Sequence, residues 1–290
     1  MKNEPDGLTI KILGNGGAIN EGLPYNSFMI NATLLCELPP DIMPSLHRNH
    51  VPISGIKRVF ISHLHGDHVF GLPFFVLSSF FESEQTGEEH PVTMIGPKGL
   101  QELARDLLIS AFRKNHPCVT WMDRYVRFIE TDASGKPLLM DGYETLLFRL
   151  DHMMETYGFL LSLPQSGAHF AYVADTLWCG AVQTIIETKP KLVLIDLNGD
   201  PGDVKPVHLS NNELVEKGLP ISGNNTLFVG THLRRRFQAK DHRIVCSEPG
   251  MRAMIPPANG GSAVIMAPVE GESLFASTGF LESDKDARSL

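Results

Sequence analysis

Three histidines and an aspartate lie within six consecutive positions, in the segment SHLHGDH at residues 62–68. Imidazole and carboxylate groups are the ligands that zinc accepts where no thiolate is offered. Alternate residues of an extended segment point the same way, so His63 and His65 can reach one metal ion. The glycine that follows lets the chain turn sharply, so Asp67 and His68 can face a second ion. This spacing favours a pair of metal ions over a solvated, histidine-rich loop.

A dinuclear site needs more ligands than this segment holds, and the rest of the chain offers them just after short apolar runs. His63 follows such a run, and so do His152, Asp175, Asp196 and His232. A sheet gathers distant residues at one edge when polar side chains stand at the ends of successive core strands. One such residue alone would more often face water. The five together predict a metal centre at a sheet edge.

The elements that must position these residues are short strands and a smaller number of helices. Apolar residues that alternate or run continuously predict strands at 8–13, 27–30, 33–37, 58–62, 126–131, 145–151, 157–163, 170–174, 192–195, 226–230 and 263–268. A spacing near 3.6 predicts helices at 72–82, 97–112 and 177–187. Ser210 and Glu213 predict a capping box at the start of a helix over 211–217. Many strands with interspersed helices indicate layers of helix on sheet.

These residues also carry a family resemblance. HLHGDH at 63–68 is similar to the signature of the metallo-β-lactamase superfamily, and the later elements resemble its ribonuclease Z branch. The matching elements are Asp151-His152 followed by YGF at 157–159, ADT at 174–176 and THLRRRF at 231–237. Asp196 and then HLS at 208–210 stand where the branch has a glutamate and an H-x-T segment. The resemblance runs from about Leu8 to Phe237.

The resemblance implies an α/β protein of layered α+β type, a four-layer αββα metallo-β-lactamase-like sandwich with the site at one edge. It places three residues on one metal ion: His63, His65 and His152. It places another three on the second ion: Asp67, His68 and His232. Asp175 bridges the two. Lactamases that bind metal through a thiolate have a cysteine near the place of this aspartate, so Asp175 points away from antibiotic hydrolysis.

Such a site suits an anionic substrate. Two zinc ions bring four positive charges, and Asp67, Asp175 and a bridging hydroxide remove three of them. The ions would lie roughly 3.5–4 Å apart and hold the hydroxide between them. Zinc lowers the pKa of bound water to roughly 7, so the nucleophile exists at neutral pH. Asp67 therefore counts both as a metal ligand and as a catalytic residue.

Three further residues are candidates for catalysis. His208, oriented by Asp196, can protonate the leaving group; the alternative is a surface histidine that caps a helix. Arg236 aligns best with the arginine of the family and can stabilise charge on a phosphoryl oxygen. For Arg234 and Arg235 a solvated turn is an equally good interpretation.

These observations predict a phosphodiesterase that uses a metal-bridging hydroxide on a small, anionic, nucleotide-like diester. A carboxylic ester, lactone or thioester hydrolase is an alternative, because the same metal pair can polarise a carbonyl. A tRNA 3′-processing endonuclease is disfavoured, because only 23 positions separate His152 from Asp175. Bacterial ribonuclease Z proteins carry a tRNA-gripping arm there, whereas this chain has room for two strands and a turn at 164–167. A dioxygenase would hold a single iron, and a binding-only module would have lost ligands.

The length and composition of the chain limit its domain number, its partners and its location. The 290 residues, 42% of them hydrophobic, allow one large domain, expected over 1–281 with a polar tail at 282–290. A net charge of −8 argues against general nucleic-acid binding. The four cysteines form no C-x-x-C pair, which favours reduced thiols in the cytoplasm. No apolar run approaches the roughly 18–20 residues of a membrane span.

Several expectations stay open at this stage. The metals are expected to be zinc, with manganese and iron as alternatives. Homodimerisation is common among lookalikes, so a homodimer is one option, although no residue of the sequence demonstrates it. The segment GNGG at 14–17 lacks the last glycine of a dinucleotide motif, so it predicts a tight loop near the metal edge. Substrate choice is expected to depend on loops at 82–91 and 251–262.

Overall fold

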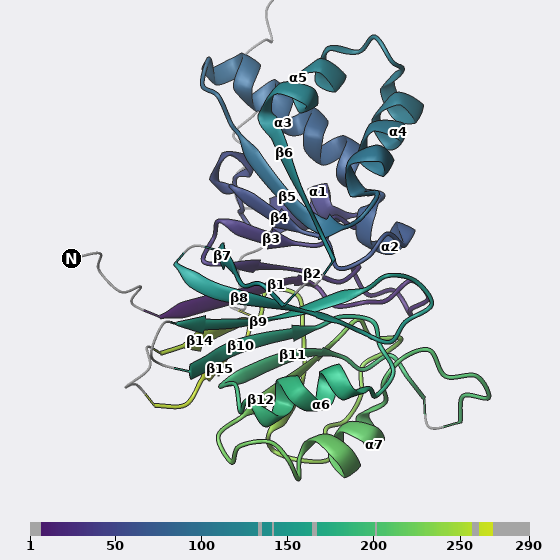
Figure 1. Ribbon diagram of the computed structural model, residues 1–290, viewed down its shortest axis with the longest axis vertical. Coiled ribbons are helices and arrows are strands. Elements are labelled where there is room, and N and C mark those ends of the chain that lie inside the picture. Colours follow the sequence, from purple (N-terminus) through teal and green to yellow (C-terminus); the bar gives the residue numbers. More distant parts are fainter. Residues whose placement is uncertain are drawn as a thin grey trace, which may run out of the picture.

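Two β-sheets stacked face to face form the centre of the molecule, and helices cover both outer faces (Figure 1). The computed structural model describes residues 7–132, 135–140, 142–163, 167–200, 202–256 and 261–268. The predicted tail at 282–290 and most of the predicted turn at 164–167 lie outside these residues. The order of layers is helix, sheet, sheet, helix, so the predicted four-layer αββα sandwich is confirmed.

Eight strands of the described residues form the first sheet, in the order β15-β14-β1-β2-β3-β4-β5-β6. They are β1 (Leu8–Gly14), β2 (Ser27–Ile30), β3 (Leu34–Cys36), β4 (Arg58–Phe60), β5 (Val92–Pro97), β6 (Val126–Thr131), β14 (Arg252–Ile255) and β15 (Val264–Met266). Strands β3 to β6 run parallel to one another, and the other pairs are antiparallel.

Seven strands of the described residues form the second sheet, in the order β13-β12-β11-β10-β9-β8-β7. They are β7 (Leu138–Met140), β8 (Tyr143–Arg149), β9 (Tyr157–Leu163), β10 (Gly167–Val173), β11 (Leu192–Asp196), β12 (Leu227–Thr231) and β13 (Ile244–Cys246). Strands β10 to β13 are parallel, and β9 runs antiparallel between β8 and β10. The two strands predicted between His152 and Asp175 are thus confirmed.

The helices divide between the two outer faces. The first sheet is covered by α1 (Ile42–Arg48), α3 (Leu72–Thr86), α4 (Leu100–Phe112) and α5 (Pro117–Tyr125), and the second by α6 (Gly180–Glu187) and α7 (Asn211–Glu213) (Figure 1). The short helix α2 (Gly66–Val69) follows β4, and a 3₁₀ turn spans Ile53–Gly55. A π-helical turn over Leu214–Gly218 continues α7, which begins with the predicted capping box of Ser210 and Glu213.

The structure corrects some boundaries and adds elements that the apolar pattern did not predict. Helix α4 begins at Leu100 rather than at residue 97, because Gly99 has φ of 87° and Pro97 ends β5. The prediction of a loop at 251–262 is wrong at 252–255, where β14 pairs with β1. The predicted loop at 82–91 is also wrong at 82–86, which complete α3. Strand β5 and helices α1 and α5 were not predicted.

Aromatic side chains join the inner faces of the two sheets. Phe60 of β4 meets Phe159 of β9 edge to face, with ring centroids 4.9 Å apart. Phe28 of β2 meets Tyr172 of β10 in the same way at 4.8 Å. All four residues are fully buried. Edge-to-face pairs add stability beyond the area they bury, so these contacts fix how the sheets face each other.

The chain directions bring the ends of the central strands to one edge. Strands β3 and β4 of the first sheet are parallel, and so are β10, β11 and β12 of the second. Strand β8 runs in the same direction as β10, because both are antiparallel to β9. The residues that follow these strands therefore lie together at one edge of the sandwich.

We predict that Phe159→Ala destabilises the fold by about 3–5 kcal/mol, because it removes a buried ring and leaves a cavity between the sheets. Urea unfolding followed by circular dichroism measures the change. Leu139→Ala is the control, since Leu139 is 70% exposed and the substitution should shift the unfolding free energy little. Equal losses in both variants would contradict the assigned core.

Candidate metal centre

The site is built from side chains that follow strands of both sheets. His63 comes after β4, His152 after β8 and Asp175 after β10. His232 comes directly after β12, and Asp196 is the last residue of β11. The edge placement predicted from the sequence is confirmed for all five. Helix α2 then turns the chain so that its own residues face the same point.

One group of nitrogen atoms comes from three histidines. His63 Nε2 lies 2.9 Å from His65 Nδ1, and His152 Nε2 lies 3.3 Å from the same atom. These three residues are the set that the family resemblance assigned to one ion. The structure therefore brings that set together.

A second group combines an aspartate with two histidines. His68 Nε2 lies 3.3 Å from His232 Nε2 and 3.4 Å from Asp67 Oδ2. His232 Nε2 lies 3.2 Å from the same Asp67 oxygen. This second predicted set also comes together, although 164 positions separate its two histidines.

Asp175 stands between the two groups. Its Oδ2 lies 3.2 Å from His232 Nε2 in the second group and 3.8 Å from His63 Nε2 in the first. Its Oδ1 is buried and lies 3.5 Å from His68 Nε2. A buried carboxylate that faces ligand nitrogens of both groups is suited to hold a cation. The placement fits the bridging position expected for Asp175.

The spacing of these atoms fits metal binding. Two ligands at 2.0–2.1 Å from a tetrahedral zinc are about 3.3 Å apart. The nitrogen and oxygen pairs within the two groups are 2.9 to 3.4 Å apart. Two imidazole nitrogens at such distances repel each other through their lone pairs unless a proton or a cation lies between them. A metal ion held by both lone pairs explains the geometry.

The charges of the side chains give the site the electrostatic character of a cation site. Burial by itself would lower the pKa of His232, but Asp175, Asp196 and Asp67 raise it to about 10. Burial lowers the pKa of His63 well below its ordinary value, so that imidazole is neutral and able to bind metal. Despite burial, the neighbouring histidines hold the pKa of Asp175 well below its usual range. The carboxylates thus stay ionised and attract positive charge.

Glu37 is a buried residue of this site that the sequence analysis missed. One of its carboxylate oxygens lies 3.2 Å from His68 Nδ1, on the far side of the ring from the ligand atom. The Glu37 carboxylate also accepts from the amide of Ser62 and from the hydroxyl of Tyr172. A carboxylate behind a metal-binding histidine fixes the orientation of the ring. Glu37 ends the predicted strand 33–37, so the strand-end rule used for the other ligands could have found it.

A chain of hydrogen bonds extends from Glu37 into the second sheet. The hydroxyl of Tyr172 accepts from the side-chain amide of Asn26 at 2.9 Å. The Asn26 carbonyl accepts in turn from the hydroxyl of Thr231 at 2.6 Å. Thr231 directly precedes the ligand His232. Buried polar atoms thus connect Glu37, behind His68, with Thr231, next to His232, across the two sheets.

Asp196 supports a third region of the site. Its Oδ2 lies 2.8 Å from His208 Nδ1, and its Oδ1 lies 3.6 Å from His232 Nδ1. Asp196 is fully buried and accepts from the backbone amides of Thr176 and Asn198. It therefore holds both His208 and a predicted metal ligand. The expected pairing of Asp196 with His208 is present.

The backbone around His232 depends on close approach of the loop at 14–17. His232 has φ of 54°, a left-handed conformation that is rare for residues other than glycine. A Cβ atom at Gly17 would come within 2.8 Å of the His232 ring. Gly17 thus has to lack a side chain for the ligand to take its place. The tight loop expected near the metal edge is confirmed.

Arg236 lies at the surface. Its guanidinium is 3.3 Å from a carboxylate oxygen of Glu248, and 65% of its side chain is exposed. Its contact with a substrate stays a prediction. Arg234 and Arg235 both lie close to Asp200, so they are held by an ion pair rather than by a solvated turn alone.

Known proteins share this architecture. The metallo-β-lactamase fold protein YhfI from Bacillus subtilis superposes with a TM-score of 0.66 over 86% of this chain and 100% of that chain, at 16% identity. The short form of human tRNase Z gives a TM-score of 0.64 over 86% of this chain and 99% of that chain, at 19% identity. Ribonuclease Z of Lactobacillus delbrueckii subsp. bulgaricus is 31% identical over 113 residues, 39% of this chain. The chain spans only 33% of the length of that relative.

The fold and the site together define a protein of the metallo-β-lactamase class. The ligand geometry, with its histidine and aspartate clusters, supports a metal-dependent hydrolase. Within this class, residues 8–240 match the family described as anti-Pycsar protein Apyc1, and the chain belongs to that family.

We predict that Glu37→Gln weakens metal binding by about 10–100-fold, because the amide keeps the shape but removes the charge behind His68. Competition with a chromophoric chelator measures the affinity. Glu248→Gln is the control, since Glu248 pairs with the exposed Arg236. An unchanged affinity in a folded Glu37→Gln protein would show that this carboxylate does not support the metal.

Proposed function

We propose that this protein is a phosphodiesterase that hydrolyses a small, anionic, nucleotide-like diester. The observation that carries the proposal is the bridging position of Asp175 beside the Asp196–His208 pair. Two ligand groups meet at this carboxylate, and a proton donor stands next to them, with His208 Nδ1 3.9 Å from Asp175 Oδ2. Cleavage of a diester needs both a centre that holds the phosphate and a group that protonates the leaving oxygen.

Seven residues would hold the metals. His63, His65 and His152 form the first group, and Asp67, His68 and His232 form the second, with Asp175 shared. Two divalent ions, zinc in the first place and manganese or iron as alternatives, would supply Lewis acidity and activate water when bound. The donor set contains nitrogen and oxygen atoms and no sulfur, as expected for a hydrolytic site of this kind.

His208 is the proposed general acid. Burial alone would lower its pKa, but the charge of Asp196 and the hydrogen bond to it raise the pKa above the ordinary value. The ring therefore holds a proton more readily than a free imidazole does. Its side chain is 18% exposed, whereas Asp196 behind it is fully buried. His208 can thus reach a substrate while Asp196 orients it.

A cavity beside the ligands has the size for a small substrate. It is lined by His65, Asp67, Tyr25, Phe70 and a few neighbouring residues, with a volume of about 420 Å³. Ligand sites typically have volumes of roughly 300–1,000 Å³. The aromatic rings of Tyr25 and Phe70 offer flat apolar surfaces next to the metal ligands. A planar group attached to a phosphate fits these surroundings.

The alternatives differ in what they require. A tRNA nuclease of the ribonuclease Z kind needs a surface that grips RNA, and the segment between His152 and Asp175 consists mainly of the paired strands β9 and β10. A carboxylic ester, lactone or thioester hydrolase would make less use of a protonated His208 beside the leaving group. We rank both alternative functions below the phosphodiesterase.

The four free cysteines support a reducing, cytoplasmic location. None of the described helices is long and apolar enough to cross a membrane.

We predict that the purified protein loaded with zinc or manganese hydrolyses bis(p-nitrophenyl) phosphate, and that a chelator stops the reaction. Release of p-nitrophenol measures the rate. His65→Ala and Asp175→Ala should each abolish the metal-dependent turnover, since each removes a donor from the ligand groups. Near-wild-type turnover in either variant would contradict the proposed metal centre. No turnover by a protein that holds two metals would instead favour lactones and thioesters.

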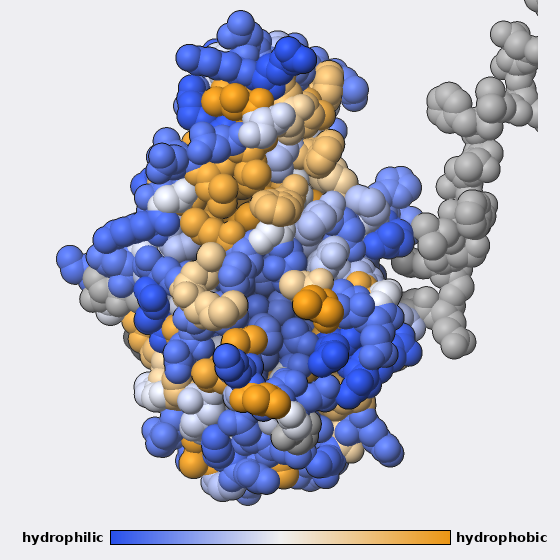
Figure 2. Space-filling view, turned by 90° about the vertical axis from the view of Figure 1, so that its right-hand side faces the viewer, coloured by the Kyte–Doolittle hydropathy of each residue, from blue (hydrophilic) through white to orange (hydrophobic). Residues whose placement is uncertain are grey.

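We also propose that two copies of the chain associate through an apolar stripe on α3. Phe74, Leu77 and Phe81 recur every three or four residues, so they share one face of α3. Phe74 and Phe81 are 51% and 48% exposed. Figure 2 shows apolar side chains gathered on the upper part of this face of the molecule. Exposed patches of this kind are typical of protein interfaces.

We predict that the wild-type protein has the mass of two chains by light scattering and that Phe81→Glu shifts it toward one chain, because a charge in the stripe is costly to bury. Leu139→Glu, at a residue 70% exposed on β7, should leave the mass unchanged. A wild-type protein that stays monomeric at every accessible concentration would contradict the dimer.

A further inference from the structure

Thr176 lies behind the metal centre, where the carboxyl ends of three strands of the second sheet meet. It directly follows Asp175 and is fully buried. Its hydrogen bonds reach the segment after β8 and the end of β11, and Thr176 itself belongs to the segment after β10. Each of these segments carries a residue of the candidate site. Thr176 is therefore placed to set how the three segments lie relative to one another.

The hydroxyl of Thr176 joins the segment after β8 to the segment after β10. The backbone amide of Asp151 donates to Thr176 Oγ1 at 3.1 Å, and the hydroxyl donates to the Leu177 carbonyl at 2.7 Å. The Leu177 amide donates in turn to the Asp151 carbonyl at 3.0 Å. A hydroxyl group has one proton and two lone pairs, so it is used here both as a donor and as an acceptor.

The hydrogen bonds of the sheet do not make this connection. Strand β9 lies between β8 and β10 in the described sheet, so each of them pairs with β9 and not with the other. Beyond the strand ends, the bonds of Asp151 with Thr176 and Leu177 span the gap. Removal of the hydroxyl would leave the Leu177 amide to hold the two segments together.

The two segments joined in this way carry a histidine ligand and the bridging aspartate. His152 directly follows Asp151, and Asp175 directly precedes Thr176. His152 Nε2 lies 4.0 Å from Asp175 Oδ2. A small shift of one segment against the other would therefore change the distance between these two ligands.

His152 lacks the support that the structure gives to another ligand of its group. Nδ1 of His63 lies 3.0 Å from Ser62 Oγ, behind the ligand atom. The side chain of His152 is 2% exposed, and its Nδ1 has no hydrogen-bond partner among the described residues. A partner on the far nitrogen normally fixes the orientation of a ligand ring. The backbone beside His152 has to fix its ring instead, and Thr176 holds that backbone.

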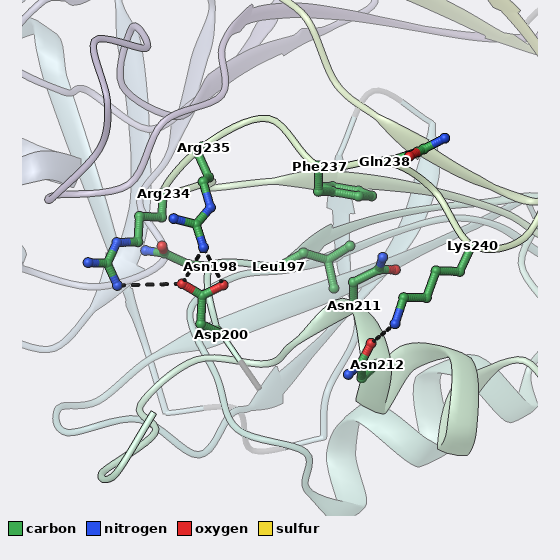
Figure 3. Close-up of a pocket in the computed structure, with 11 residues that line it drawn as sticks. Leu197, Asn198, Asp200, Asn211, Asn212, Arg234, Arg235, Phe237, Gln238 and Lys240 are labelled. Atoms are coloured by element: carbon green, nitrogen blue, oxygen red, sulfur yellow. Dashed lines mark hydrogen bonds and ion pairs between the residues drawn. The ribbon is translucent and has the colours of Figure 1, made fainter. Parts of the chain in front are cut away.

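Thr176 also supports Asp196, but through its backbone. Its amide donates at 3.2 Å to Asp196 Oδ2, the oxygen that lies 2.8 Å from His208 Nδ1. The other oxygen of Asp196 accepts from the amide of Asn198, whose side chain lines a recess of about 220 Å³ (Figure 3). No side-chain atom of Thr176 takes part in these bonds. A substitution of the Thr176 side chain therefore leaves the support of His208 in place.

We propose that the Thr176 hydroxyl is a positioning group that sets His152 against Asp175, and so determines how tightly the ion of the first ligand group is held. The proposal rests on the ligand set of the proposed function. The hydroxyl acts through the backbone before His152 and does not itself reach the metal. Asp175 is held by β10, so His152 is the ligand that moves when the hydroxyl is lost. The ion of the second group should keep its affinity.

The test is stepwise zinc binding by the full chain, measured by competition with a chromophoric chelator. Thr176→Val keeps the shape of the side chain and removes the hydroxyl, so the affinity for one of the two ions should fall about tenfold. Thr176→Ser keeps the hydroxyl and should bind both ions like the wild type. Thr145→Val is the matched control, because Thr145 is also fully buried but lies near the start of β8, away from the ligands.

Cobalt in place of zinc gives a second readout, because its absorption spectrum reports the ligand geometry. Thr176→Val should change the bands of one cobalt ion only. Thr176→Ala lacks the same hydroxyl and takes its place if the valine protein does not fold. Unchanged affinities in a folded variant without the hydroxyl would overturn the role of Thr176. Equal weakening of both ions, or a serine variant as weak as the valine variant, would do the same.

These affinities are measured without substrate, which separates the role of Thr176 from the proposed activity. A protein that shows the expected affinities but cleaves no diester would lose the proposed function and keep the role of Thr176. A wild type that binds fewer than two zinc ions would contradict the ligand set and the positioning role together.

Discussion

The buried carboxylate of Asp175 is the constraint on which the rest of the site depends. An ionised carboxylate in a protein interior is strongly unfavourable unless positive charge or donors surround it. Two histidines with raised pKa values, His232 and His68, supply this charge and follow strands of different sheets, so the two sheets must meet at this edge. The inter-sheet aromatic contacts of Phe60 and Tyr172 lie behind it and set that meeting. The packing of the two sheets and the geometry of the ligand cage therefore depend on each other.

Support for the ligands comes from residues that never face the substrate. Glu37 lies behind His68, and Asp196 lies behind both His232 and His208. Each of these carboxylates is fully buried and accepts from backbone amides. Rings held from behind cannot turn away when a ligand leaves, which keeps the donor atoms in place between turnovers. The left-handed backbone at His232 is retained for the same reason.

Two recesses lie near the predicted metal ligands. Tyr25 and Phe70 line one of them together with His65 and Asp67, and Asn198 and Asn211 line the other. The second recess also carries Arg234, Arg235 and Lys240 against the carboxylate of Asp200. The walls of both come largely from segments outside the strands, where side chains can vary without disturbing the sheets.

The sequence alone predicts the scaffold class and seven candidate metal ligands. Four of these lie in the run HLHGDH and three follow predicted strands, because ligand chemistry and strand periodicity are both local properties of the chain. The supports of the ligands depend on the tertiary structure. Glu37 reaches His68 because β3 lies beside β4, and Asp196 reaches His208 and His232 because β11 lies beside β12. Those neighbours are distant in sequence, so no local pattern encodes the contacts. Burial, which gives an unpaired acceptor or a carboxylate its energetic importance, exists only once both sheets have closed over them.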